Sequence, residues 1–357
     1  MLAAGLAALV FAGLEGLTAL RYGHSHFLFQ SGVYSSVNPL KKYLYLAGPL
    51  VTLMGAVAPG IALLGWVGLK ARGRVIVAGG ALIVLGFVAL ALVPEQYQHF
   101  SFGGWPKGGP ITLAQLHFAV CGLAVYATLL AGMARLCELR WADWKGWLKE
   151  WSARRTEFFL VLWLLLEVGG YFTLSPIPAV RRMPGLLVVS ALMVGRLASH
   201  SGLSKERAAL WRAVVAGSMA LGLLFYVVDL RDAQAEKSTV ERTVQRISEL
   251  GEQSGRVWYV GRWGFQYYAE RAGMLPVVPV ESDFQEGDLL VTTDAPYFPE
   301  PVKQHIAQYA TEPLGQLSVS DALPLRTMIG FYNSGIPLKH HEGPRRTVNI
   351  YRIHLAR

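Results

Sequence analysis

Side chains capable of acid–base, metal or phosphate chemistry interrupt the apolar parts of this chain at three places. The first holds His24, His26, Asn38, Lys41 and Lys42, the second Glu95 and His99, and the third Arg181 and Arg182. The two histidines could ligate a metal or move a proton, and Glu95 and His99 would share one face if their segment were helical. Because this spacing is weakly specific, surface or interfacial histidines are the plainer alternative, and we assign no metal ligand.

The arginine pair indicates a different chemistry, the binding of phosphate. Guanidinium groups match phosphate oxygens in bidentate geometry, so Arg181 and Arg182 would suit a lipid-linked phosphate at a membrane surface. Arginines beside a membrane span also bind ordinary phospholipid headgroups. The sequence alone leaves both interpretations open.

The composition indicates a membrane protein. The 357 residues are 53% hydrophobic and only 16% charged, which is too apolar for soluble domains of this length. The net charge of +9 is unevenly divided, because residues 1–229 carry +10 and residues 230–357 carry −1. A basic excess confined to the apolar part is typical of a membrane protein and argues against a nucleic-acid partner.

Seven apolar segments approach or exceed the roughly 20 residues that a helix needs to cross a bilayer. They are residues 1–20, 43–69, 75–94, 108–134, 158–180, 183–199 and 208–229. Arg196 and Arg212 lie near segment ends, where long cationic side chains can reach the interface. We expect Glu167, inside the fifth segment, to pair between helices. The sequence therefore predicts a multi-pass α-helical membrane protein with about seven transmembrane helices.

Loop charges predict the orientation in a cell (inner) membrane. Eleven cations lie in the loops on one side and six on the other, which places the first side and the N terminus in the cytoplasm. An amphipathic helix near residues 139–153, with tryptophans at helical spacing, would lie on that cytoplasmic surface among the membrane lipids. The six cations on the opposite side are Arg21, Lys41, Lys42, Lys107, Arg181 and Arg182. They suggest that an anionic ligand binds outside the cytoplasm.

Residues 230–357 have the pattern of a soluble α/β domain on the extracytoplasmic side. Strand-like runs alternate with helical stretches, and about 128 residues are enough for a separate core. We interpret Gly261 and Gly264 as turn formers and residues 339–346 as a solvated loop. The expected helices are residues 232–252, 265–271 and 301–309, and the expected strands are 256–260, 276–280, 288–292 and 348–355.

Three stretches resemble one enzyme family. Residues 24–40, 174–182 and 259–268 resemble the later part of bacterial family 39 glycosyltransferases (GT-C fold), which are related to dolichyl-phosphate-mannose protein mannosyltransferases. The resemblance implies a polyprenyl-phosphate sugar as donor and transfer outside the cytoplasm, and it leaves a divalent metal open as a cofactor. The residues that match and carry over as donor-site candidates are His24, His26, Asn38, Arg181 and Arg182.

The sequence departs from that family in lacking an acidic motif before the first outer loop, so the catalytic residue stays unassigned. We therefore expect either the C-terminal portion of a longer enzyme, partnered by its N-terminal half, or a non-catalytic membrane protein whose α/β tail binds a glycan or protein. A transporter is a weaker alternative, because the spans show no internal repeat. Lys41, Lys42, Glu95 and His99 complete the candidates for binding the donor's phosphate or sugar.

Overall fold

The computed structural model divides the chain into two compact units. The helical unit comprises Met1–Leu92, Tyr97–Gly222 and Ile329–Lys339, and the α/β unit comprises Val93–Gln96, Leu223–Met328 and His340–Arg357. The structure describes residues 2–22, 39–100, 111–136, 154–175, 178–251, 255–261, 264–279, 281–293, 300–327 and 336–355.

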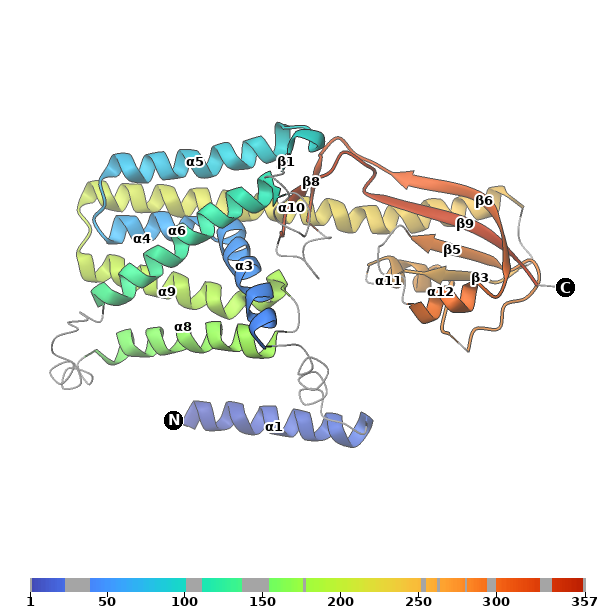
Figure 1. Cartoon of the computed structure of the whole chain (residues 1–357), viewed down its shortest axis with the longest axis horizontal. Helices are drawn as coiled ribbons and strands as arrows, with labels where there is room; N and C mark the ends of the chain where they lie inside the picture. Colours follow the sequence, from blue (N-terminus) through green and yellow to red (C-terminus); the bar gives the residue numbers. More distant parts are fainter. Residues whose placement is uncertain are drawn as a thin grey trace. The chain divides into compact units, whose positions relative to one another are not determined.

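Apolar helices build the helical unit (Figure 1). They are α1 (Leu2–Tyr22), α3 (Pro39–Val57), α4 (Pro59–Gly68), α5 (Gly73–Leu92), α6 (Leu113–Leu136), α8 (Arg155–Leu174), α9 (Pro184–Ser201) and the first part of α10 (Lys205–Glu249). Within the described residues, α5, α6, α8 and α10 are long and apolar enough to cross a membrane, and the bent pair α3–α4 would add a fifth span. This supports a membrane protein, whereas the predicted count of seven spans stays a prediction.

The apolar run over residues 43–69 does not form one straight helix, because the chain bends by 74° between α3 and α4. Ala58 leaves the helical region, with φ −139° and ψ 40°, and Pro59 starts α4. Proline cannot donate the backbone hydrogen bond that would continue α3, but it fits the first turn of a new helix. The apolar run is therefore divided into two helices at one residue.

Glycines allow α3 to cross α6 in backbone contact. A Cβ atom built on Gly122 would lie 1.9 Å from the carbonyl oxygen of Val51, and one built on Gly55 would lie 1.9 Å from that of Phe118. Small residues permit such close approach between helices in an apolar environment. Around this crossing, fully buried side chains such as Leu53 form part of the core of the helical unit.

Helix α10 is continuous over 45 residues. We expected a span over residues 208–229 and a separate amphipathic helix over residues 232–252, but nothing in the sequence separates them, since residues 223–249 contain no glycine or proline. The helix ends before Gly251, whose φ of 71° suits the left-handed conformation that commonly follows a helix.

The α/β unit is built on a five-stranded mixed sheet in the order β4-β3-β5-β9-β6. Its strands are β3 (Val257–Val260), β4 (Leu275–Pro276), β5 (Leu289–Thr293), β6 (Ala310–Val319) and β9 (Arg346–His354). Strands β4, β3 and β5 are parallel, while β9 runs antiparallel between β5 and β6. The predicted strands correspond to β3, β4, β5 and β9, although β4 is shorter than expected and β6 was not predicted.

Two cores cover the faces of the sheet. Val240 and Ile247 of α10, with Phe265 of α11 (Gly264–Arg271), pack in the core that contains Val291 and Val348. The other core contains Trp258 and Leu290, and Ile306 of α12 (Glu300–Ile306) packs against it. Successive side chains of a strand point to opposite faces, so the consecutive apolar residues of these strands make both faces of the sheet apolar.

A buried carboxylate ties the start of β3 to the start of β5. Asp288 accepts hydrogen bonds from the backbone N–H of Arg256 at 3.0 Å, the indole of Trp258 at 2.8 Å and the backbone N–H of Gln285 at 2.9 Å. Burial alone would raise the pKa of Asp288, but these donors outweigh it and lower the pKa below its ordinary value.

We predict that Gly122→Ala destabilises the helical unit, because the added methyl group meets the backbone of Val51. The expected loss is about 1–3 kcal/mol. Thermal unfolding of the purified protein in detergent measures it. Gly195→Ala is the matched control, since nothing lies within 4 Å of its added Cβ atom. Equal melting temperatures for the two variants would contradict a tight α3–α6 crossing.

We predict that Asp288→Asn weakens the α/β unit by about 1–3 kcal/mol at neutral pH, since it replaces a charged acceptor of several buried hydrogen bonds. Because the pKa of Asp288 is lower in the folded state, its charge stabilises the folded state fully when the pH is above the unfolded-state pKa of about 3.9. This contribution is lost as the pH falls through the folded-state pKa. The melting-temperature difference from wild type should therefore shrink between pH 7 and pH 3. The control is Asp283→Asn, which changes an exposed carboxylate. If the melting-temperature difference between Asp288→Asn and wild type did not depend on pH, the lowered pKa of Asp288 would be refuted.

Candidate functional site

Arg181 and Arg182 form an exposed cationic turn between α8 and α9. They belong to the short 3₁₀ turn η2 (Val180–Arg182), and both side chains are exposed. The local sequence explains this turn, because Ser175 is extended after α8 and Pro184 can only begin α9. The predicted phosphate-binding pair is therefore accessible at one end of the helical unit.

The N-terminal end of α3 lies at the same end of this unit. The ring of Tyr43 meets the ring of Phe172, near the end of α8, edge-on at a centroid distance of 5.9 Å. Lys41 and Lys42 precede Tyr43 in the first turn of α3. The fold thus brings four of the nine candidate positions to one end, which we call the cationic end and define as Lys41, Lys42, Arg181 and Arg182.

Helices α8 and α9 run antiparallel, and their contacts fix the register. Near the start of α8, Glu157 pairs with Arg196 of α9 at 2.6 Å. Further along α8, the carboxylate of Glu167 lies against Gly185, where a Cβ atom would be 2.2 Å from its Oε1 atom. Glu167 thus lies at the contact between α8 and α9, but it accepts a hydrogen bond from Trp163 of its own helix, so its pairing between helices stays a prediction. One turn later on α8, Tyr171 lies at the level of the cationic end.

Tyr171 and Tyr126 are polar groups that the sequence did not reveal. Both hydroxyl oxygens are buried, and neither has a hydrogen-bond partner among the described residues. Sequence reasoning missed them because a tyrosine in an apolar span fits the hydrophobic pattern, and only the fold shows that its hydroxyl is enclosed.

Glu95 and His99 do not share a helical face. Glu95 begins the 3₁₀ turn η1 (Glu95–Tyr97), whereas His99 lies in the short strand β1 (His99–Phe100), paired with β2 (Ile111–Thr112). The carboxylate of Glu95 contacts Nδ1 of His341 at 3.1 Å and accepts a hydrogen bond from the backbone N–H of Glu342 at 3.2 Å. Glu95 is thus held by the segment after β8 (Lys339–His340).

The other sequence candidates lie outside the described residues. These are His24, His26 and Asn38, and the same applies to Lys107 and the predicted surface helix near residues 139–153. No group of three or more histidine, cysteine, aspartate or glutamate side chains in the described part of the chain could hold a metal ion. The divalent metal therefore stays an open expectation.

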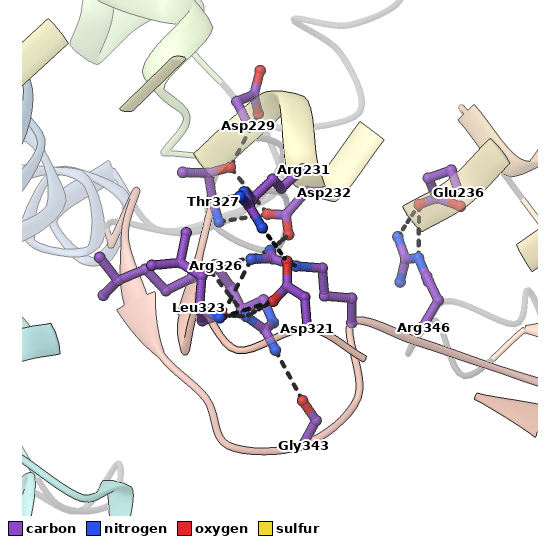
Figure 2. A network of polar contacts seen from close by, with 12 residues as sticks. Asp229, Arg231, Asp232, Glu236, Asp321, Leu323, Arg326, Thr327, Gly343 and Arg346 are labelled. Atoms are coloured by element: carbon purple, nitrogen blue, oxygen red, sulfur yellow. Dashed lines mark hydrogen bonds and ion pairs between the residues drawn. The ribbon is translucent and has the colours of Figure 1, made fainter. Parts of the chain in front are cut away.

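A second polar cluster lies in the α/β unit, on one face of α10 (Figure 2). Asp232 accepts hydrogen bonds from the backbone N–H of Thr327 at 2.7 Å and from its hydroxyl at 3.1 Å, and it pairs with the guanidinium of Arg345. Arg345, only 2% exposed, also pairs with Asp321 at 2.7 Å. The Thr327 hydroxyl also donates to Asp229 at 3.0 Å.

Glu236 continues this acidic face of α10. It pairs with Arg346, whose Nε atom lies 2.7 Å from Oε1 (Figure 2), and its side chain packs against Gly264 at the N terminus of α11. A Cβ on Gly261 would lie 2.4 Å from the ring of Phe265, which supports the interpretation of these glycines as turn formers.

The prediction of a solvated loop over residues 339–346 is wrong at both of its ends. Lys339 and His340 form the strand β8, and His340 is buried. Arg345 and Arg346 are largely buried and paired with acids of α10. Burial alone would raise the pKa of Asp321, but its contacts with Arg345, Arg231 and the backbone N–H of Leu323 together lower the pKa below the ordinary value. These groups satisfy one another, so we interpret the cluster as a structural clamp and the cationic end as the candidate ligand site.

No family model, curated protein or solved structure matches the chain. A proposal for its function therefore rests on the features described above.

We predict that Arg345→Met unfolds or strongly weakens the α/β unit, because Asp232 would keep a buried charge without its cation. Removing one partner of a buried ion pair costs about 3–5 kcal/mol. Limited proteolysis of the purified protein should show faster cleavage within residues 230–357. Lys237→Met breaks only the exposed pair with Glu241 and should cost at most about 1 kcal/mol. Equal protection of the two variants would argue against the clamp.

Proposed function

We propose that the protein is a glycosyltransferase, or the C-terminal portion of one, that transfers a sugar from a polyprenyl-phosphate donor at the extracytoplasmic membrane face. The observation that carries the proposal is the cationic end. Exposed Arg181 and Arg182 lie on the turn between two apolar helices, at the same end of the unit as Lys41 and Lys42. A phosphate attached to a membrane lipid would meet these positions at the bilayer surface.

The cationic end suits both the binding of the donor's phosphate and the transfer of the sugar. In that step an acceptor oxygen attacks the anomeric carbon, the bond between that carbon and the phosphate oxygen breaks, and the phosphate leaves with the electron pair. Guanidinium groups on the phosphate would stabilise the charge that develops on the leaving oxygen. The proton of the acceptor needs a base, and we assign this role to no residue.

Two further observations support the proposal. The apolar helices α5, α6, α8 and α10 are able to cross a membrane, as an enzyme with a polyprenyl donor requires. The segment Leu174–Arg182, which resembles family 39 glycosyltransferases, is the segment that ends in the exposed arginines. The orientation with the cationic end outside rests on the loop-charge bias.

One observation favours a second candidate function, a membrane protein that binds a glycan or partner without transferring a sugar. Glu95, the one carboxylate among the sequence candidates, is engaged by His341 and Glu342. A carboxylate held in this way is less suited to accept a proton from an acceptor. Binding without transfer would identify this function.

We expect the purified full chain in detergent to bind radiolabelled undecaprenyl phosphate, and the double variant Arg181→Ala/Arg182→Ala to bind it more weakly. Each guanidinium lost should cost about tenfold in Kd, equivalent to about 1.4 kcal/mol. Binding should also weaken with added salt, because the site is exposed. Filter retention of the labelled lipid measures both effects.

The matched control is Arg212→Ala, which removes an exposed arginine of the same helical unit near the start of α10. Unchanged affinity in the double variant would exclude the phosphate assignment. Release of sugar from labelled undecaprenyl-phosphate sugar to an added acceptor separates transfer from binding alone.

A further inference from the structure

A patch of exposed cations lies at the end of the helical unit opposite the cationic end. We call it the basic patch and define it as Lys70, Arg72, Arg74 and Lys205. Helix α9 separates the two regions, since Arg182 precedes it and Lys205 follows it, and its 18 residues span about 27 Å. The hydrocarbon core of a bilayer is about 30 Å thick, so a membrane that contains α9 places the basic patch at its second surface.

Two turns of the chain meet at the basic patch. The guanidinium of Arg207 donates hydrogen bonds to the carbonyl oxygens of Val67 and Lys70, each at 3.2 Å. Ala71 and Leu203 pack against the same apolar cluster, to which Val67 belongs. These contacts hold the turn between α4 and α5 against the turn between α9 and α10. The cations of both turns are thereby gathered at one surface.

The cations of the basic patch have no counter-ion in the described part of the chain. None of the four forms an ion pair there. Glu206 is the single acidic residue within residues 66–80 and 200–212. By contrast, Arg196 of α9 is neutralised by Glu157 at 2.6 Å. The basic patch therefore presents uncompensated positive charge to an anion from outside the described chain.

The backbone around the basic patch does not favour cations. Lys70 has a φ of 59° and closes α4, where the N–H of Ala71 bonds to the carbonyl oxygen of Trp66 at 2.9 Å. Glycine is the usual residue at such a position, because a side chain disfavours positive φ. Arg72 and Arg74 flank the first residue of α5, and the first turn of this helix contains no acidic side chain. Since the start of a helix carries partial positive charge, fold stability alone would favour an acid there.

We propose that the basic patch binds the headgroup of an anionic phospholipid. Lysine and arginine clusters beside membrane spans attract such lipids, and the phosphate of the headgroup would neutralise the uncompensated charge. Val75 and Val77 near the start of α5 are exposed, so they can contact the acyl chains of the same lipid. Trp66 and Trp211 pack in the apolar cluster beneath the two turns, and tryptophan favours the membrane interface. This inference does not depend on the proposed function.

The test titrates the purified full chain in detergent with phosphatidylglycerol or phosphatidylcholine of identical acyl chains, and native mass spectrometry counts the bound lipid. Wild type should bind the anionic lipid at least about tenfold more tightly than the zwitterionic one. This preference should be lost in the quadruple variant Lys70→Gln/Arg72→Gln/Arg74→Gln/Lys205→Gln. The matched control removes four exposed cations from the α/β unit and should keep the preference: Lys237→Gln/Arg242→Gln/Arg246→Gln/Lys303→Gln.

The single variant Lys70→Gly distinguishes loss of the lipid from loss of the fold. Glycine suits the positive φ at this position, so the variant should melt in detergent at the temperature of wild type or above it. Its affinity for phosphatidylglycerol should nevertheless fall about fivefold, because one cation is lost. Added phosphatidylglycerol should therefore raise its melting temperature less than that of wild type.

Three results would overturn the proposal: no preference of wild type for phosphatidylglycerol, retention of the preference by the quadruple variant, or displacement of the lipid by soluble glycerol 3-phosphate. The last result would identify a soluble phosphate ester as the ligand. The variant Arg181→Ala/Arg182→Ala should keep the preference, and its loss in that variant would assign the lipid to the cationic end instead.

Discussion

Burying a carboxylate is tolerable only where a cation or several donors meet it, and this constraint organises the α/β unit. Asp232 and Glu236 face inward from α10, and Arg345 and Arg346 at the start of β9 neutralise them. Asp288 is met in both ways, by backbone and indole donors and by the guanidinium of Arg256 at 3.0 Å. Apolar packing covers the sheet, but these charges specify where α10 and β9 must lie within the unit, because a shifted register would leave them unpaired.

The helical unit pairs some of its polar groups and leaves others unpaired. Glu157 is neutralised by Arg196. The helices themselves approach closely because Gly55 and Gly122 allow backbone contact. Tyr126 and Tyr171 differ, since their hydroxyls have no partner in the described chain. The hydroxyl of Ser190 is unpaired among the same residues, so in this unit not every buried polar group is satisfied by the described part of the chain.

Local patterns predicted the features that depend on neighbouring residues. The apolar runs over residues 75–94 and 108–134 contain most of α5 and of α6, and the run over residues 288–292 is nearly β5. The exposed arginine turn also followed from sequence. Features set by distant residues were not predictable. Arg345 reads as part of a polar loop because its partner Asp232 lies 113 residues earlier, and the place of β9 inside the sheet depends on pairing with both β5 and β6. The bend at Ala58 was missed because Pro59 lies within an apolar run.

Strand β9 has a consequence for biosynthesis. It is the last strand of the sheet in sequence, yet it lies between β5 and β6 and supplies the arginine that neutralises Glu236. Until residues 346–354 have left the ribosome, β5 and β6 have no partner between them, and the carboxylates of α10 have no cations. Contacts this distant in sequence form slowly and leave strand edges open meanwhile. The sheet and the ion pairs of α10 are therefore completed only once β9 has been synthesised.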